Sequence, residues 1–127
     1  MLMPTADLTP EIRRFIIARI RSVPMLEALL LVRSSAEEWT VPKLVSRLYL
    51  PEARVMSLIG ELCSEGLASF DKGKVRYAPS SSEVDEMVSS IAMIYSRHVV
   101  TVAELIHSGL ERQAQDFADA FRLRRDK

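Results

Sequence analysis

The side chains that most often carry out chemistry in proteins are few in this sequence and far apart. The single cysteine, Cys63, lies near the end of a predicted helix, where a buried thiol is usually unreactive. His98 and His107 are nine positions apart, so one helix would place them on nearly opposite faces. Glu104 shares a face with His107, but a zinc site needs three or four ligands. We therefore expect no catalytic residue, no metal site, no cofactor and no enzyme.

Signals for phosphate binding are also weak. The four glycines are isolated, at positions 60, 66, 73 and 109, so the sequence contains no glycine-rich loop to hold a phosphate. The 17 basic residues are balanced by 17 acidic ones, and the net charge is zero. Because proteins contact DNA phosphates mainly through lysine and arginine, this balance does not by itself favour a nucleic-acid partner. Positive charge is concentrated at the two ends of the chain, whereas residues 79–110 are acidic.

The bulk properties are those of an ordinary globular protein. The 127 residues suit one domain, and 48% of them are hydrophobic and 27% charged. One cysteine cannot form an internal disulfide, which suits a reducing compartment. The N-terminus carries no basic-then-apolar signal, and no uncharged apolar run is long enough to cross a bilayer. We expect a soluble cytoplasmic protein that does not associate with membranes.

The elements that would position functional side chains are concentrated in residues 40–77. A short helix begins at Thr40, which can cap it, and ends before Pro51, because a proline excludes the preceding residue from helical geometry. A second helix follows Pro51, with an apolar face formed by Val55, Leu58, Ile59 and Leu62. Gly66 is predicted to end this helix, with Leu67 folding back as the accompanying apolar contact.

A small β-hairpin is predicted next, giving a mainly α protein with a β-hairpin. Residues 69–70 and 75–77 form two β-prone arms around a polar turn that contains Gly73, and Trp39 can lie on a third strand against them. This order of elements resembles a winged helix-turn-helix domain. Glu65-Gly66-Leu67 stands where such domains carry E-x-G-L or A-G-L before the wing. The likeness covers about half the chain and, at the level of the fold, includes small bacterial transcriptional regulators of the MarR, ArsR and PadR types.

The resemblance implies binding to double-stranded DNA. In helix-turn-helix proteins the second helix of the motif enters the major groove by its N-terminal residues. By position, Arg54 would read guanine and Ser57 would bond a base edge or a phosphate, while basic residues of the preceding helix and the wing would contact the DNA backbone. The DNA-binding residues implied in this way are Lys43, Arg47, Arg54, Ser57, Lys72, Lys74 and Arg76. A dimeric regulator would bind a palindromic site.

The second helix also suits a different partner. Residues 51–66 carry one positive charge against three negative ones, on Glu52, Glu61 and Glu65. Glu52 fits the positive end of a helix dipole, or could accept from a cytosine amino group. Together with Met56 and Gly60, however, the carboxylates Glu52 and Glu61 make a partly apolar, acidic surface of the kind that contacts protein. The alternative function is therefore a winged-helix module that binds a protein partner instead of DNA.

Helices are also predicted outside this motif. Thr9 and Ser22 each cap a helix in the N-terminal part of the chain. Ser82 with Asp85 approximates a capping box, and the helix that starts there is predicted to continue to about His107 and to end by Gly109. A last helix is predicted over residues 110–123.

The long C-terminal helix carries apolar residues in steps of four and three, as in a coiled coil. A winged domain needs only the central half of the chain for its core, so the resemblance implies that the outer helices form a homodimer; burial within one chain is the alternative. The predicted dimer contacts are Ile12, Phe15, Ile16, Val88, Ile91, Tyr95, His98, Val102 and Leu105. We divide the chain into an N-terminal arm and helix (1–21), a winged helix-turn-helix domain (22–79) and a C-terminal helical dimerisation region (80–127).

Overall fold

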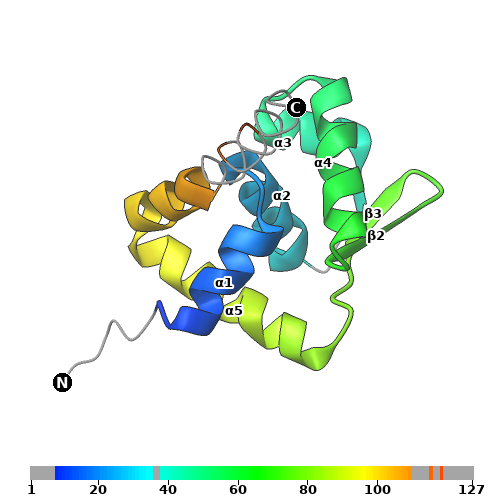
Figure 1. Cartoon of the computed structure of the whole chain (residues 1–127). Coiled ribbons are helices and arrows are strands. Elements are labelled where there is room, and N and C mark those ends of the chain that lie inside the picture. The colour runs from blue at the N-terminus through cyan, green and yellow to red at the C-terminus, as the bar shows by residue number, and fades with distance from the viewer. Residues whose placement is uncertain (1–7, 36–37, 110–114, 116–117, 119–127) are drawn as a thin grey trace, which may run out of the picture.

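The computed structural model describes residues 8–35 and 38–109, together with residues 115 and 118, and the chain is mainly helical with one small antiparallel sheet (Figure 1). In chain order the elements are α1 (Pro10–Arg19), α2 (Val23–Ser34), β1 (Trp39–Thr40), α3 (Val41–Leu48), α4 (Glu52–Ser64), β2 (Ala68–Asp71), β3 (Lys74–Tyr77) and α5 (Ser82–Arg97). A further helical segment covers residues 99–109. The mainly α class with a small hairpin is confirmed. The helix predicted over residues 110–123 lies, except for residues 115 and 118, outside the described residues.

Hydroxyl caps set the start of four helices, because each side-chain oxygen accepts from a first-turn N–H that has no partner inside the helix. Thr9 caps α1, Ser22 caps α2 and Thr40 caps α3, as the sequence predicts. The start of α5 corrects a prediction. Its cap is Ser81, whose hydroxyl accepts from the Val84 N–H at 3.1 Å, and Ser82 is the first residue of the helix.

A tight turn joins α3 to α4 at the predicted position. Tyr49 follows the last residue of α3 in the left-handed conformation, with φ 58° and ψ 43°, and its N–H donates to the Val45 carbonyl at 2.9 Å. The chain then passes through Leu50 and Pro51, and α4 begins at Glu52 without a side-chain cap. A left-handed backbone costs roughly 1–2 kcal/mol at a residue other than glycine. Tyr49 is therefore an energetically costly residue at this turn.

Gly66 ends α4, as predicted. Its φ is +73°, and the N–H groups of Gly66 and Leu67 donate to the carbonyls of Cys63 and Leu62 at 3.1 and 2.9 Å, which is a Schellman motif. Leu67 is fully buried. A Cβ at Gly66 would lie 3.1 Å from the Ser80 hydroxyl oxygen, so both the backbone angle and the available space require glycine. This turn directs the chain from α4 into β2.

The three strands form an antiparallel sheet in the order β1-β3-β2. Val75 of β3 pairs with Trp39 on one side and with Phe70 on the other, and both Trp39 and Val75 are buried. At the hairpin tip Lys72 and Gly73 both have positive φ, the pattern of a type I′ turn. The third strand predicted for Trp39 is thus confirmed.

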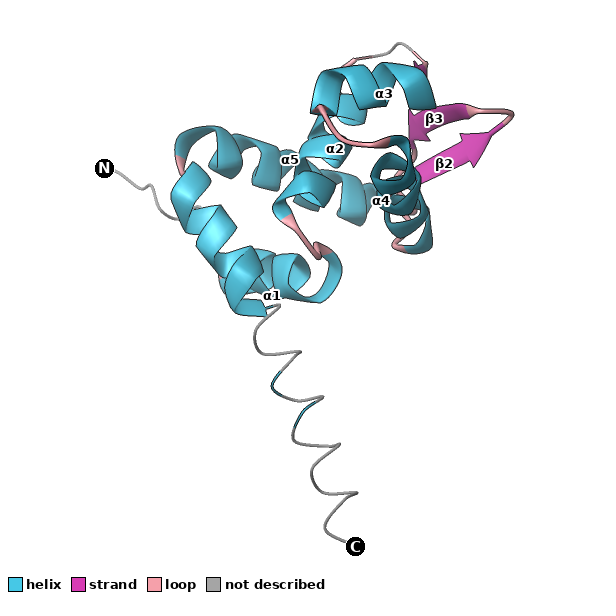
Figure 2. Cartoon of the chain, turned by 90° about the horizontal axis from the view of Figure 1, so that it is seen from above, coloured by secondary structure: helices cyan, strands magenta, loops and turns pink. Residues whose placement is uncertain are grey.

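The hydrophobic core is organised around α2, which lies among the other helices and the sheet (Figures 1 and 2). Helix α2 packs against α3, α4 and β3, while α1 packs against α5. The buried residues of α2 are Met25, Leu26, Ala28, Leu29 and Val32. One cluster of buried side chains continues from α1 to the segment 99–109. The regions 1–21, 22–79 and 80–127 therefore share one core within the described residues.

The prediction of one long helix after residue 82 is wrong, because the chain bends at His98. Helix α5 ends at Arg97, His98 has φ −132° and ψ 59°, and a new helical segment starts at residue 99. The His98 carbonyl accepts from the Val102 N–H at 3.1 Å, the first bond of the new segment. Val102 and Ile106 are buried in the shared core. Because of the bend, the apolar residues after His98 pack into the core of the same chain.

Gly109 was predicted to end the long helix, but it is itself helical and buried. A Cβ at this position would lie 3.1 Å from Cγ2 of Ile17 in α1. Such a distance is shorter than ordinary van der Waals contact, so glycine allows the segment 99–109 to approach α1 closely.

Most residues predicted to form a dimer interface lie in the core of the single chain. Five of them are buried: Ile12, Ile16, Val88, Ile91 and Val102. Phe15, Tyr95 and Leu105 are half-buried, and His98 is exposed at the bend. The five buried side chains have almost no surface left for a second copy. Their apolar stripes are covered within one chain, which is the alternative to a dimer seam.

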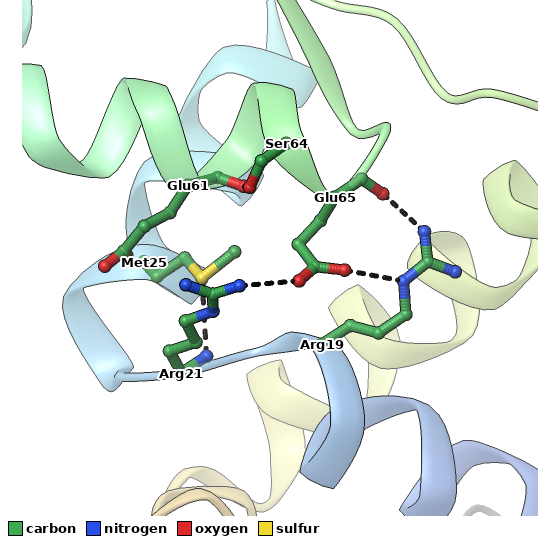
Figure 3. Close-up of polar contacts among 6 residues, drawn as sticks. All are labelled: Arg19, Arg21, Met25, Glu61, Ser64 and Glu65. Carbon is green, nitrogen blue, oxygen red and sulfur yellow. Dashed lines mark hydrogen bonds and ion pairs between the residues drawn. The ribbon is translucent and has the colours of Figure 1, made fainter.

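A cluster of charged side chains connects α1 and the residues after it to the end of α4 (Figure 3). The two carboxylate oxygens of Glu65 accept from Arg19 Nε at 3.1 Å and from Arg21 Nη2 at 2.9 Å. Arg19 also donates to the Glu65 backbone carbonyl and lies over the Phe15 ring, 4.9 Å from its centroid. Because the Arg19 and Glu65 side chains are only 29% and 17% exposed, solvent and salt screen this pair less than a surface ion pair.

Replacing Glu65 with alanine should lower the free energy of unfolding by about 1–3 kcal/mol, because Arg19 then remains partly buried without its carboxylate. Denaturant unfolding measures this change. Glu104→Ala, at an exposed position of the segment 99–109, is the matched control and should change the free energy by less than ~0.5 kcal/mol. High salt should reduce the difference between the two variants. Equal stabilities of the two variants would contradict a stabilising role for the cluster.

Candidate nucleic-acid interface

The seven residues that the resemblance implicates lie on three neighbouring elements. Helices α3 and α4 pack together, and α4 packs against β2 of the hairpin. In both views these elements lie together on one side of the molecule (Figures 1 and 2). All seven side chains are exposed except that of Arg54, which is half-buried; by element they are Lys43 and Arg47 on α3, Arg54 and Ser57 on α4, and Lys72, Lys74 and Arg76 on the hairpin.

The two basic residues of α3 are held over the ring of Trp39. Lys43 Nζ lies 5.0 Å and Arg47 Cζ 5.4 Å from the ring centroid, within the range of cation–π attraction. Trp39 is buried whereas Lys43 and Arg47 are exposed, so the two long side chains cover the indole and keep their charges at the surface. One turn apart on α3, they form a fixed pair of positive charges.

Glu38 pairs with two of the three basic side chains of the hairpin. Its carboxylate accepts from Lys74 Nζ at 2.9 Å and from Arg76 Nη2. The hydrogen bonds from Lys74 and then Arg76 lower the pKa of Glu38, so these ion pairs persist at neutral pH. The sequence patterns do not single out Glu38. Its position beside the hairpin cations follows from the register of β1 and β3. Because Trp39 pairs with Val75, antiparallel geometry brings the preceding residue beside Arg76.

The outer face of α4 has mixed chemistry. Its inner face consists of Val55, Leu58, Ile59 and Leu62, which are buried as predicted. Of the outer residues, Glu52, Ser57 and Gly60 are exposed, Met56 is 41% exposed, and Glu61 is half-buried. The N-terminal N–H groups of α4 have no side-chain cap, and Glu52 stands in the first turn at the positive end of the helix dipole. The first-turn N–H groups are therefore available to a hydrogen-bond-accepting partner, with the Glu52 carboxylate beside them.

The base of the hairpin is attached to α5 by Tyr77. Its hydroxyl donates to Asp85 Oδ1 at 2.6 Å. Burial, together with the hydrogen bond to Asp85 and the charge of that carboxylate, raises the pKa of Tyr77 to about 12, so the hydroxyl stays protonated at neutral pH. Arg33 Nη2 donates to Ser89 Oγ at 2.8 Å and connects α2 to α5 nearby. The hairpin is thus fixed at its base, and its tip extends away from the helices (Figure 1).

The side chains that most often carry catalytic or metal-binding chemistry lie apart in the described part of the chain. Among the described residues, no group of three or more His, Cys, Asp or Glu side chains is arranged to hold a metal ion. His98 and His107 are both exposed. Burial raises the pKa of the Cys63 thiol, which disfavours the reactive thiolate. An open hollow between the end of α2 and β3 contains Arg33, Arg76 and Glu38, so positive and negative charges occur together in it.

No helix in the described ranges is both long enough and apolar enough to cross a bilayer. No protein-family model, curated protein or solved structure matches the chain.

Replacing Glu38 with glutamine should free Lys74 and Arg76 for an external phosphate and delay elution from phosphocellulose in a salt gradient. Glu104→Gln removes the same charge from an exposed position on another element and controls for net charge. Both variants should elute later than the wild type, with the Glu38 variant last. If the two variants elute together, the position of the carboxylate beside the hairpin does not matter and the local account is wrong.

Proposed function

We propose that this protein is a winged helix-turn-helix DNA-binding protein that regulates transcription as a homodimer. The observation that carries the proposal is the arrangement of α2, β1, α3, α4, β2 and β3, in which a tight turn joins two helices and a hairpin follows, with the sheet order β1-β3-β2. That arrangement fits the winged helix-turn-helix domain that the sequence resembles. The exposed basic side chains of α3 and the hairpin, together with the half-buried Arg54 of α4, lie on one side of the molecule and support DNA as the partner.

In this proposal the first half of α4 enters the major groove of the DNA. Arg54 donates to guanine, and Ser57 bonds a base edge or a phosphate. Lys43 and Arg47 contact the backbone from α3, and the hairpin contacts it from the other side of α4. Because Glu38 pairs with Lys74 and Arg76, Lys72 is the hairpin cation with no carboxylate partner among the described residues. Lys72 is therefore expected to make the strongest backbone contact of the three.

The proposed homodimer uses a different surface from the buried seam. Met93, Val99 and Val100 are large apolar side chains exposed on both sides of the bend at His98, and Val100 is 68% exposed. Exposed large apolar side chains that are near one another along the chain favour a protein contact. A second copy of the chain fits this contact, because a two-fold symmetric dimer presents two copies of α4 to a palindromic DNA site.

The protein-binding module remains the alternative function. Exposure of Met56, with the exposed carboxylate of Glu52 one turn before it on α4, favours this function. A phosphate backbone repels carboxylates, whereas a protein partner can cover an apolar side chain. The half-buried Glu61 adds a further negative charge to the same helix. The arrangement of α3 and α4 is the same in both cases. The two functions differ in what the outer face of α4 contacts, so DNA binding by the whole chain distinguishes them.

Light scattering of the purified protein should give about twice the 14.3 kDa mass of one chain. Val100→Asp should shift the protein toward the monomer, because a charge would be buried in the interface. Ser82→Asp, at an exposed polar position at the opposite end of α5 from the bend, provides a matched charge control. A wild-type protein that is monomeric at micromolar concentration would exclude the proposed dimer.

Selection from a random pool of duplexes should enrich a palindrome whose half-sites lie about one helical turn, or ~34 Å, apart. Arg54→Ala should then reduce discrimination between bases by about 1–3 kcal/mol, because it removes a direct base contact. Lys72→Ala should instead weaken binding to all duplexes alike and reduce the salt slope by about one unit. Fluorescence anisotropy on matched and mismatched duplexes measures both effects.

Failure to enrich any duplex at low salt, with folded protein present, would contradict the DNA-binding proposal and favour the protein-binding module. If duplexes are enriched but Arg54→Ala and Lys72→Ala have the same effect on all of them, the orientation proposed for α4 is wrong.

A further inference from the structure

We propose that Tyr49 contacts the DNA backbone, with its phenolic hydroxyl donating a hydrogen bond to a phosphate beside the groove that α4 enters. The inference rests on the proposed DNA-binding function and adds a residue to it that is neither charged nor part of α4.

The backbone at Tyr49 favours other residue types. Its φ of 58° and ψ of 43° place it in the left-handed region, where the end of a helix is occupied mainly by glycine and sometimes by asparagine. Among the described residues only Tyr49 and Lys72 have positive φ without being glycine. Glycine or asparagine would allow the same turn with less strain. A strained backbone at a residue that could be replaced by glycine or asparagine indicates that its side chain has a role.

The side chain of Tyr49 contributes nothing visible to the fold. It is 90% exposed, and its hydroxyl makes no hydrogen bond to a described residue. The other two tyrosines of the sequence behave differently. Tyr77 and Tyr95 are half-buried, and their hydroxyls donate to Asp85 at 2.6 Å and to Glu27 at 3.1 Å. Tyr77 and Tyr95 thus stabilise the fold through their hydroxyls. At Tyr49, by contrast, the backbone conformation is unfavourable and the ring is exposed to solvent.

The position of Tyr49 favours a phosphate over a protein partner. It lies in the turn between α3 and α4, and the basic residues Arg47 and Arg54 precede and follow it. Its immediate neighbours Leu48 and Leu50 are half-buried against the core, so the exposed ring does not continue into an apolar patch along the turn. Tyrosine hydroxyls are common donors to DNA phosphates. The tyrosine hydroxyl is uncharged, so it does not form an ion pair with the nearby Glu52. It can therefore donate a hydrogen bond to a phosphate.

Two substitutions separate the side chain from the backbone strain. Tyr49→Phe removes only the hydroxyl, and Tyr49→Asn replaces the ring by a residue that suits left-handed geometry. Tyr95→Phe is the matched control, because it removes the same atom from a tyrosine on α5. Each full-length variant is examined by thermal unfolding and by anisotropy with a random-sequence duplex at low salt, since a phosphate contact acts on all sequences alike.

We expect Tyr49→Phe to weaken duplex binding by about tenfold with unchanged thermal stability, as befits a lost hydrogen bond to a charged group. Tyr49→Asn should weaken binding at least as much while raising the midpoint of thermal unfolding. Tyr95→Phe should leave duplex binding unchanged. Weaker duplex binding together with a higher unfolding midpoint in the same variant cannot come from a purely structural role of Tyr49.

Wild-type affinity of Tyr49→Phe for the duplex would overturn the inference alone, because the hydroxyl would then make no contact with a phosphate. A lower unfolding midpoint for Tyr49→Asn would overturn it as well, because the side chain would then stabilise the fold. If the wild-type protein binds no duplex, the proposed function fails and the inference fails with it.

Discussion

Helix α2 is apolar around most of its circumference, and Met25, Leu26, Ala28, Leu29 and Val32 are all buried. Such a helix is stable in water only when other elements cover it on several sides. Helices α3 and α4 and strand β3 provide this cover, and the same core extends to α1, α5 and the segment 99–109. The position of α4, and with it the orientation of its outer face, follows from the requirement to bury α2.

Electrostatics then decides which part of this surface is available to a partner. The net charge of the chain is zero, and Glu38 and Glu65 each pair with two basic side chains. Arg47 is exposed over Trp39, and Lys72 is exposed at the hairpin tip. Local pairing, and not total charge, therefore sets the positive surface, and the proposed DNA contact is weaker than the number of lysines and arginines alone would indicate.

Much of the fold could be predicted from the sequence, because local signals determine it. Hydroxyl caps, Pro51, the glycine after α4 and the polar hairpin turn predict elements that the structure contains. The bend at His98 could not be predicted, because neither glycine nor proline marks it and the apolar spacing fits a straight helix equally well. The pairing of Glu38 and the conformation of Tyr49 depend on strand register and on tertiary geometry, which local patterns do not encode. For the same reason, an apolar stripe cannot by itself distinguish a dimer seam from a core.

The proposed binding surface for duplex DNA consists of α3, the turn at Tyr49, the first half of α4 and the hairpin tip. Backbone amide chemical shifts of the labelled protein, followed while duplex is added, locate the surface that DNA contacts. We expect the largest shift changes in these elements and little change at the solvent-exposed positions of α5. Changes confined to α5 and the bend at His98, or no change at an excess of duplex, would contradict DNA binding at this surface.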